Sequence, residues 1–213
     1  MKYHLFYQCF VFLICILLAS STLASNGDEA NKNNHKHHTN MEMKTEDTLP
    51  EMSIFQLDSK WTNQEGKTIQ LKDLSSQPTI FAMVYTSCGY ACPIITSTML
   101  DLEKKMEKIK ISNVKFLLIS FDPEKDTSKQ LKEYAKKRKM NLNKWMLITS
   151  DNATVQELAV VLGVNYKKLQ NGDIAHSNII FLMDQSGVIK NKVVGLNKDV
   201  DSLIDSINKL NKQ

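Results

Sequence analysis

The segment Thr86-Ser87-Cys88-Gly89-Tyr90-Ala91-Cys92-Pro93 separates two different hydrophobic patterns. Before it, residues 80–85 form a short, continuous apolar run, which is typical of a buried strand. After it, apolar residues recur at helical spacing, and Pro93 suits the first turn of a helix, where a missing N–H leaves no bond unmade. The sequence therefore predicts that Cys88 and Cys92 lie between the end of a strand and the N-terminus of a helix.

Two cysteines at such a place favour redox or metal chemistry. The partial positive charge of a helix N-terminus favours thiolate over thiol, and it can lower a cysteine pKa well below the free value of about 8.5. Residues four apart in a helical turn or a tight loop also face the same way. We therefore expect Cys88 and Cys92 to form a disulfide, to hold a soft metal, or both. The structural alternative is a pair of buried, inert cysteines.

Length and composition indicate an ordinary globular protein with extensions. The chain has 213 residues, of which 42% are apolar and 23% charged, enough for one domain with a full core. The net charge of +4 rests almost entirely on lysines, and Arg138 is the one arginine. This charge is too mild to indicate a nucleic-acid partner. Two of the four cysteines, Cys9 and Cys15, fall in an N-terminal apolar run, so no zinc pattern of two cysteine pairs exists.

The N-terminus has the order of a secretory signal. Lys2 precedes an apolar run over residues 5–19, and small residues follow up to Ser25. We expect residues 1–24 to be a signal peptide, with an uncleaved membrane anchor as the alternative. The protein is then exported to the periplasm or to the outer face of the cytoplasmic membrane. There, Cys88 and Cys92 need a thiol reductant or a bound metal to avoid oxidation.

Residues 25–48 are polar and read as a disordered linker. This linker contains a cluster of potential metal ligands, namely His35, His37, His38, Met41 and Met43. Imidazole suits Cu(II), zinc and nickel, while thioether suits Cu(I). The tract is either a loose collector of copper or a polar tail that happens to contain histidines.

Residues 49–213 are predicted to form an α/β domain. Residues 55–58 and 68–71 alternate apolar and polar and predict an N-terminal β-hairpin. Core strands are expected at residues 80–85, 114–121, 145–149 and 179–183, and an outer strand at 188–194. Helices are expected at residues 93–108, 128–139, about 151–163 and 200–210. This order gives a central mixed sheet flanked by helices, and cysteines at the mouth of the first core strand are typical of a thioredoxin-like fold.

His176 is the one histidine of this predicted domain. It precedes a strand whose leading turn faces the cysteine loop in a thioredoxin-like topology. A thioredoxin proper has a cis-proline there, but the prolines of this chain lie elsewhere. Two thiolates and one imidazole form a small, soft site that suits Cu(I), and with an added oxygen ligand Cu(II). We therefore predict a metal site made of Cys88, Cys92 and His176.

The domain resembles the Sco/SenC family of copper-binding, thioredoxin-like proteins over about residues 49–210. The resemblance rests on Cys88-Gly89-Tyr90-Ala91-Cys92-Pro93, on Phe121-Asp122-Pro123-Glu124-Lys125-Asp126-Thr127, and on His176-Ser177. It implies copper held by two cysteines and a histidine. It also implies delivery of that copper to the binuclear site of cytochrome c oxidase, or maintenance of that site's cysteines in the reduced state.

Two positions depart from the family pattern. The family usually has proline after the first cysteine, where this chain has Gly89, and aspartate directly before the histidine, where it has Ala175. The nearest acid, Asp173, lies two residues further back. Metal-bound imidazoles commonly rely on a neighbouring hydrogen-bond acceptor, so Ala175 bears on how His176 is oriented.

Four functions compete at this stage. A copper chaperone uses both cysteines and His176, whereas a thiol–disulfide oxidoreductase acting on exported proteins needs the cysteines alone, with Cys88 as the attacking thiol. A peroxidase needs a base or arginine near the reactive thiol, and Arg138 lies in a basic helix with no evident link to the cysteines. A purely structural module leaves the cysteine spacing unexplained.

The basic run at residues 136–139 is interpreted as a solvent-exposed helix face.

Overall fold

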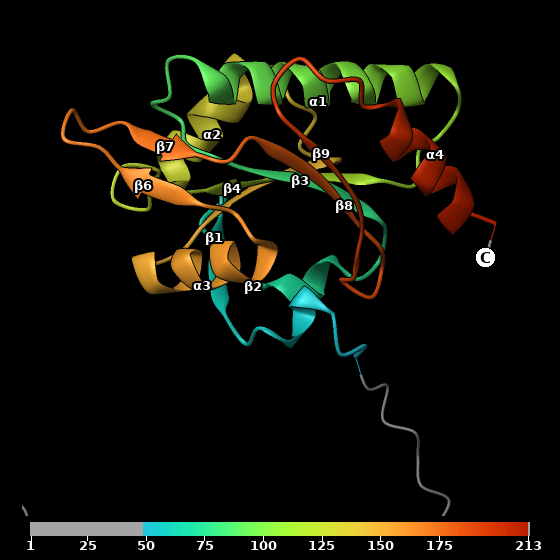
Figure 1. The fold of residues 1–213 in the computed structure, drawn as a ribbon, viewed down its shortest axis with the longest axis horizontal. Helices are drawn as coiled ribbons and strands as arrows, with labels where there is room; N and C mark the ends of the chain where they lie inside the picture. The colour runs from blue at the N-terminus through green and yellow to red at the C-terminus, as the bar shows by residue number, and fades with distance from the viewer. Residues whose placement is uncertain (1–48, 213) are drawn as a thin grey trace, which may run out of the picture. The chain divides into compact units, whose positions relative to one another are not determined.

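A seven-stranded sheet organises residues 49–212, the part of the chain that this computed structural model describes (Figure 1). The sheet consists of β1 (Lys60–Asn63), β2 (Thr68–Gln70), β3 (Thr79–Val84), β4 (Lys115–Ser120), β5 (Trp145–Thr149), β8 (Ile179–Met183) and β9 (Ile189–Val194). Its order is β2-β1-β5-β4-β3-β8-β9. Strands β3, β4 and β5 run parallel, while the other pairings are antiparallel. The predicted mixed sheet is confirmed.

The central strands are apolar because both faces of the sheet are covered. Every residue of β3 and β8 is buried, which explains why these segments read as continuous apolar runs rather than as alternating ones. Phe81 of β3 lies opposite Phe181 of β8, and their rings stack with centroids 5.0 Å apart. This buried centre of the sheet leads to the carboxyl end of β3, where the cysteine loop begins.

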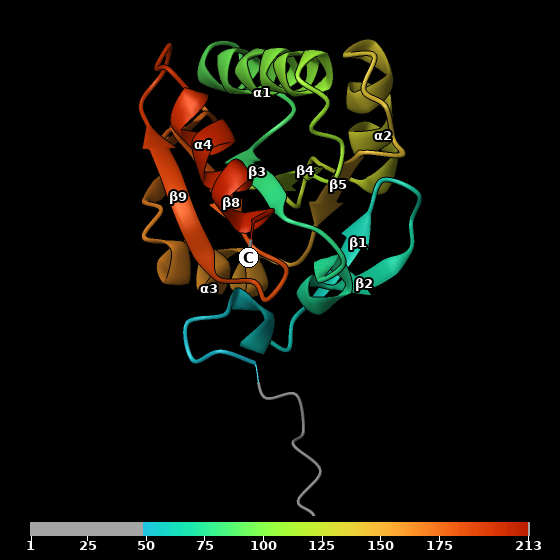
Figure 2. The ribbon, with the colours of Figure 1, turned by 90° about the vertical axis from the view of Figure 1, so that its right-hand side faces the viewer.

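Four helices cover the sheet: α1 (Ala91–Lys108), α2 (Ser128–Lys137), α3 (Asn152–Leu162) and α4 (Asp201–Leu210). Helix α1 lies over one face and α3 over the opposite face (Figures 1 and 2). Local chemistry sets their ends. The side chain of Thr127 accepts a bond from the Gln130 N–H before α2, and Asp151 accepts one from the Thr154 N–H before α3. Gly163 ends α3 at φ +67°, in the left-handed region that glycine tolerates best.

The predicted N-terminal hairpin exists, but its first strand was misplaced. The structure pairs β1 with β2, while residues 55–58 do not form a strand. Instead Ile54–Gln56 form a short 3-10 helix, η1, because the Ser53 hydroxyl accepts a bond from the Phe55 N–H and starts a turn. A second 3-10 helix, η2 (Leu71–Leu74), follows β2 directly.

A separate two-stranded ribbon was not predicted. It pairs β6 (Tyr166–Lys168) with β7 (Ile174–His176) in antiparallel register, and its strands do not pair with those of the main sheet. Figure 1 shows the ribbon near the loop that leads into α1. Its last residue, His176, lies opposite Tyr166.

The expected signal peptide (residues 1–24) and linker (25–48), with Cys9, Cys15 and the histidine and methionine tract, lie outside the described residues. Within residues 49–212, no helix is both long and apolar enough to cross a membrane.

Candidate metal centre

The two cysteines of the folded domain occupy different environments. Helix α1 begins at Ala91, two residues earlier than predicted, so Cys92 lies in its first turn and Cys88 in the loop before it. The Cys88 sulfur accepts a bond from the Cys92 N–H at 3.3 Å, and the Cys92 sulfur accepts one from the Tyr85 N–H at 3.4 Å. Cys92 has no exposed surface, whereas Cys88 is half-buried, and both thiols are free.

His176 reaches this pair from the far end of the chain. Its Nε2 atom lies 3.5 Å from the Cys92 sulfur. The donor atoms of Cys88, Cys92 and His176 all lie within 4.8 Å of one another. The structure therefore brings together the three residues that the sequence singled out. Among residues 49–212, this is the one group of three or more potential ligands so arranged.

Backbone and aromatic contacts fix the imidazole. The Nδ1–H of His176 donates to the carbonyl of Ser177 at 3.0 Å, which leaves the Nε2 lone pair facing the cysteines. Phe121 covers the ring at a centroid distance of 4.9 Å, and Tyr85 meets it edge-on at 6.0 Å. Burial lowers the pKa of His176, which favours the neutral, ligating form. The Ser177 carbonyl thus provides the acceptor that Ala175, which is exposed, does not.

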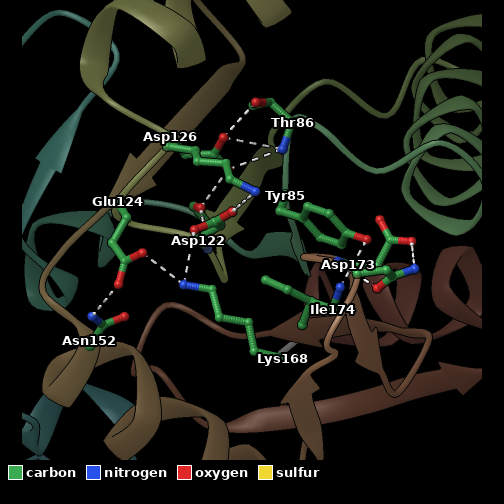
Figure 3. A network of polar contacts seen from close by, with 12 residues as sticks. Tyr85, Thr86, Asp122, Glu124, Asp126, Asn152, Lys168, Asp173 and Ile174 are labelled. Atoms are coloured by element: carbon green, nitrogen blue, oxygen red, sulfur yellow. Dashed lines mark hydrogen bonds and ion pairs between the residues drawn. The ribbon is translucent and has the colours of Figure 1, made fainter.

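The ribbon that carries His176 is attached at several points. The Tyr85 hydroxyl accepts a bond from the Ile174 N–H at 3.3 Å. The ammonium of Lys168 pairs with Glu124 at 2.8 Å and lies 4.0 Å from the buried carboxylate of Asp122 (Figure 3). These contacts join β6 and β7 to the ends of β3 and β4, so the position of the histidine depends on residues outside the ribbon.

A buried carboxylate ties the cysteine loop to the sheet. Asp126, with no exposed surface, accepts bonds from the Thr86 N–H at 3.0 Å, from the Thr86 hydroxyl, and from the Ser120 hydroxyl at 2.6 Å (Figure 3). Thr86 follows β3 and Ser120 ends β4, so Asp126 links two neighbouring strand ends, one of which leads into the cysteine loop. Part of the 121–127 motif therefore has a structural role in shaping the site.

The two thiols differ in acidity. Burial raises the pKa of Cys88, but the Cys92 N–H, which donates to its sulfur, and the nearby polar groups of Tyr90 and Tyr85 outweigh burial and lower the pKa. Burial also raises the pKa of Cys92, and the neighbouring Cys88 sulfur raises it further. Without a metal, Cys88 is the more readily ionised thiol.

This donor set fits a soft metal ion. For metal–ligand bonds of about 2.0–2.3 Å, as in zinc sites, donors around one ion lie roughly 3.5–4 Å apart, close to the spacing found here. Thiolates select Cu(I), and imidazole also suits copper. A hollow of about 430 Å³ that both Cys88 and His176 line gives solvent and partners access to the centre.

No role at the centre was predicted for Tyr85, nor for Phe121, Asp126 and Ser177, although the last three stand in the motifs that carry the family resemblance. The prediction that Arg138 has no link to the cysteines was wrong. Arg138 and Cys88 line one cleft, because the C-terminal part of α2 lies beside the start of α1. The proximity of the two helices, set by the tertiary fold, has no local signal in the sequence.

The fold and the centre together define a class of protein, the thioredoxin-like domains whose loop cysteines meet a histidine to form a metal-binding site. A family model described as SCO1/SenC matches residues 47–212, and the chain belongs to that family.

Known relatives agree with this assignment. The SCO1 protein homolog of Bacillus subtilis is 28% identical over 149 residues, which span 68% of this chain and 77% of that protein. Among solved structures, a SCO1/SenC family lipoprotein from Bacillus anthracis matches with a TM-score of 0.67 and 26% identity, over 72% of this chain and 92% of that one. Arabidopsis thaliana ScoI with copper bound matches with a TM-score of 0.64 and 26% identity, over 72% and 96%. The predicted thioredoxin-like α/β fold is thereby confirmed.

Proposed function

We propose that this protein is an exported copper chaperone that binds one copper ion through Cys88, Cys92 and His176. The observation that carries the proposal is the convergence of two sulfurs and one imidazole nitrogen within 4.8 Å. The match to a copper-bound ScoI structure supports copper as the metal.

The residues have distinct roles in this proposal. Cys92, which has no exposed surface, holds the ion from the inside, while Cys88 and His176 face the hollow through which an acceptor approaches. Transfer proceeds by ligand exchange, in which acceptor thiolates replace these ligands in turn. Oxidation to a Cys88–Cys92 disulfide removes both thiolates and therefore blocks binding, so the redox state of the pair controls loading.

The destination that we propose is the copper site of cytochrome c oxidase, which the family resemblance implies. Residues 1–24 then direct export, with a retained anchor as the alternative, and residues 25–48 link that segment to the domain. The protein acts in the periplasm or on the outer face of the cytoplasmic membrane, where a thiol reductant keeps the cysteines open.

A Cu(I) titration of the reduced protein against a chromogenic competitor tests the proposal. We expect about one copper per domain, the capacity of one three-ligand site. His176→Ala and either Cys→Ser variant should bind more weakly, by more than the roughly 10–100-fold that loss of an outer-shell partner costs. Ser87→Ala, an exposed neighbour of Cys88, is the matched control and should bind like wild type. Equal affinity of His176→Ala and wild type would overturn the proposal.

The same titration on a form that lacks residues 25–48 measures the contribution of the histidine and methionine tract. Because a tract without fixed geometry binds weakly, we expect the tight equivalent to remain and only loosely bound copper to disappear.

One observation favours thiol–disulfide exchange as a second candidate function. Cys88 is accessible and its pKa is lowered, whereas Cys92 is buried behind it, an arrangement of an attacking and a resolving thiol. For an oxidoreductase, Cys92→Ser should trap a mixed disulfide with exported proteins, and His176→Ala should leave turnover intact. Loss of copper binding without loss of turnover in His176→Ala would show that the two activities are separate.

A further inference from the structure

Cys88 is open to solvent on a second side, away from His176. A cleft of about 430 Å³ lies between the cysteine loop and α2, and its lining contains Cys88 but neither Cys92 nor His176. One face of α2 forms its far wall, with residues at the i, i+3, i+4, i+7 and i+8 positions: Gln130, Glu133, Tyr134, Lys137 and Arg138. The volume falls in the range of small-molecule sites, about 300–1,000 Å³.

The guanidinium of Arg138 is held in place in this cleft. It lies over the ring of Tyr134 at 5.0 Å and donates through Nη1 to the carbonyl of Pro93 at 3.4 Å. The Tyr134 hydroxyl is itself hydrogen-bonded to the Thr96 hydroxyl at 3.0 Å. A guanidinium has five N–H donors, so most of them remain for a ligand, and its planar shape suits a carboxylate.

The cleft combines charges of both signs. Lys137 lies next to Arg138 and adds a second cation, while Glu133 provides a carboxylate one helical turn away. Within residues 49–212, none of these three side chains takes part in an ion pair. A ligand that matches them has both an anionic and a cationic group, as an α-amino acid does.

We propose that this cleft binds a low-molecular-weight thiol of the α-amino acid type, which reduces the Cys88–Cys92 disulfide. The ligand's carboxylate meets Arg138 and Lys137, its ammonium meets Glu133, and its sulfur reaches Cys88. The inference rests on the proposed function in one respect, because it takes the disulfide to be the closed form of the copper site.

The reaction consumes two thiol molecules for each protein disulfide. The thiolate of the first ligand attacks the Cys88 sulfur, the Cys88–Cys92 bond breaks, and Cys92 leaves as a thiolate that takes a proton from solvent. The thiolate of a second ligand molecule then attacks the sulfur of the first ligand in the mixed disulfide. This step releases the Cys88 thiolate and the disulfide of the two ligand molecules. Two electrons pass from the ligands to the protein.

Burial decides which sulfur is attacked. Cys92 has no exposed surface and lines neither of the hollows beside the loop, whereas Cys88 lines both. The hollow on the His176 side gives access to the metal ligands, and the α2 cleft gives access to Cys88 alone. Reduction and copper transfer can thus proceed from different sides of one sulfur.

The test measures reduction rates of the oxidised full chain by three thiols. L-Cysteine has both charges, cysteamine lacks the carboxylate, and 3-mercaptopropionate lacks the ammonium. Each reduction rate is first corrected for the fraction of the thiol that is ionised. It is then divided by the rate at which the same thiol reduces hydroxyethyl disulfide, because this division removes differences in intrinsic nucleophilicity. We expect L-cysteine to exceed cysteamine by about tenfold, the effect of one charge-assisted contact at a partly exposed site.

Variants locate this preference in the cleft. Lys137→Gln should reduce the cysteine-to-cysteamine ratio several-fold, Arg138→Gln should reduce it further, and Glu133→Gln should reduce the preference for L-cysteine over 3-mercaptopropionate. Lys136→Gln changes the net charge equally on the same helix but does not line the cleft, so it should keep the wild-type ratios. Equal corrected rates for all three thiols, or an equal loss in Lys136→Gln and Lys137→Gln, would overturn the proposal.

A second measurement separates the cleft from the copper function. Alkylation of Cys88 in the reduced chain by iodoacetate and by iodoacetamide needs no metal and no disulfide. Lys137→Gln should lower the iodoacetate-to-iodoacetamide ratio several-fold relative to Lys136→Gln, whatever the copper titration gives. An unchanged ratio refutes the cleft even if copper binds. Weak copper binding with a changed ratio refutes the chaperone function and leaves the anion site standing.

Discussion

Replacing Asp126 by asparagine should weaken both the fold and the metal centre. This carboxylate has no exposed surface and accepts bonds from the N–H and hydroxyl of Thr86 and from the hydroxyl of Ser120. Asparagine keeps the shape of the side chain, but it has no charge and only one acceptor oxygen. The change therefore tests the three hydrogen bonds without creating a cavity.

The expected loss follows from the difference between charged and neutral hydrogen bonds. A bond to a charged group contributes about 1.5–3 kcal/mol and a neutral one about 0.5–1.5 kcal/mol, so three bonds lose roughly 3 kcal/mol together. The amide is easier to bury than the carboxylate, which offsets part of this loss. We expect Asp126→Asn to lower the free energy of unfolding by about 2 kcal/mol. For a urea m-value of about 1–3 kcal/mol/M, the midpoint then falls by roughly 1 M.

The same change should reach the metal through the cysteine loop. Thr86 lies two residues before Cys88, so a looser Thr86 widens the range of positions open to that sulfur. Outer-shell partners of metal ligands typically contribute 10–100-fold in affinity, and we expect a Cu(I) affinity loss in the lower part of that range.

Urea denaturation and competitive Cu(I) titration measure the two effects. The matched control is Asp101→Asn, whose ion pair with Lys104 is exposed, with side-chain exposures of 74% and 67%. An exposed pair contributes under about 1 kcal/mol, so this control should resemble wild type in both assays. If Asp126→Asn unfolds at the same urea concentration as Asp101→Asn and binds copper equally well, Asp126 does not support the fold or the centre.

Three further predictions concern the turn of the β8–β9 hairpin, the reactive thiol and the ribbon. Gly187→Ala places a Cβ 2.6 Å from the nearest side-chain carbon, at a backbone φ of +78°. Gly172→Ala has a similar φ of +85°, but its Cβ meets open space. The thermal midpoint of the Gly187→Ala variant should therefore fall more than that of the Gly172→Ala variant. Because the pKa of Cys88 is lowered, its alkylation by iodoacetamide, followed against pH by mass spectrometry, should reach half-maximal rate at a lower pH than in the urea-unfolded chain; an equal or higher midpoint contradicts the assignment. Tyr85→Phe leaves the buried Ile174 N–H without its acceptor, so chemical denaturation should show a loss of about 1–2 kcal/mol, and a wild-type midpoint would refute the contact.

Much of the fold could be predicted because its central strands and helices have strong local patterns. The apolar run at residues 80–85 became β3 (Thr79–Val84), and the apolar spacing after Pro93 became α1. Single residues placed the helix ends as well. Asp151 and Gly163 begin and end α3 through side-chain capping and a left-handed turn, both of which depend on residue type alone.

The failures occurred where short elements depend on tertiary contacts. The strand Tyr166–Lys168 has two lysines and no apolar alternation, since the ribbon is only partly buried and neither of its strands crosses the core. The alternation at residues 55–58 suggested a strand, but burial of Ile54 and Phe55 is met by a 3-10 turn. Three-residue elements carry too little periodicity to distinguish these cases.

For the candidate metal centre, the three proposed ligands could be predicted from the sequence, but the groups that support them could not. Cys88, Cys92 and His176 have side chains whose chemistry is evident from residue type, and the topology of the sheet brings them together. The acceptor for the imidazole is a main-chain carbonyl, that of Ser177, and every residue has one. No residue identity can therefore reveal it before the backbone path is known.

The complete burial of Cys92 would set the order in which the proposed ligands release copper. If copper occupies the proposed site, an incoming acceptor meets Cys88 or His176 first, and the sulfur of Cys92 stays attached after the other two have let go. The ion would then be bound at once by the Cys92 sulfur and by the ligands of the acceptor, and it would not be released into water. In such an exchange, at least one protein ligand would stay on the ion until the acceptor holds it.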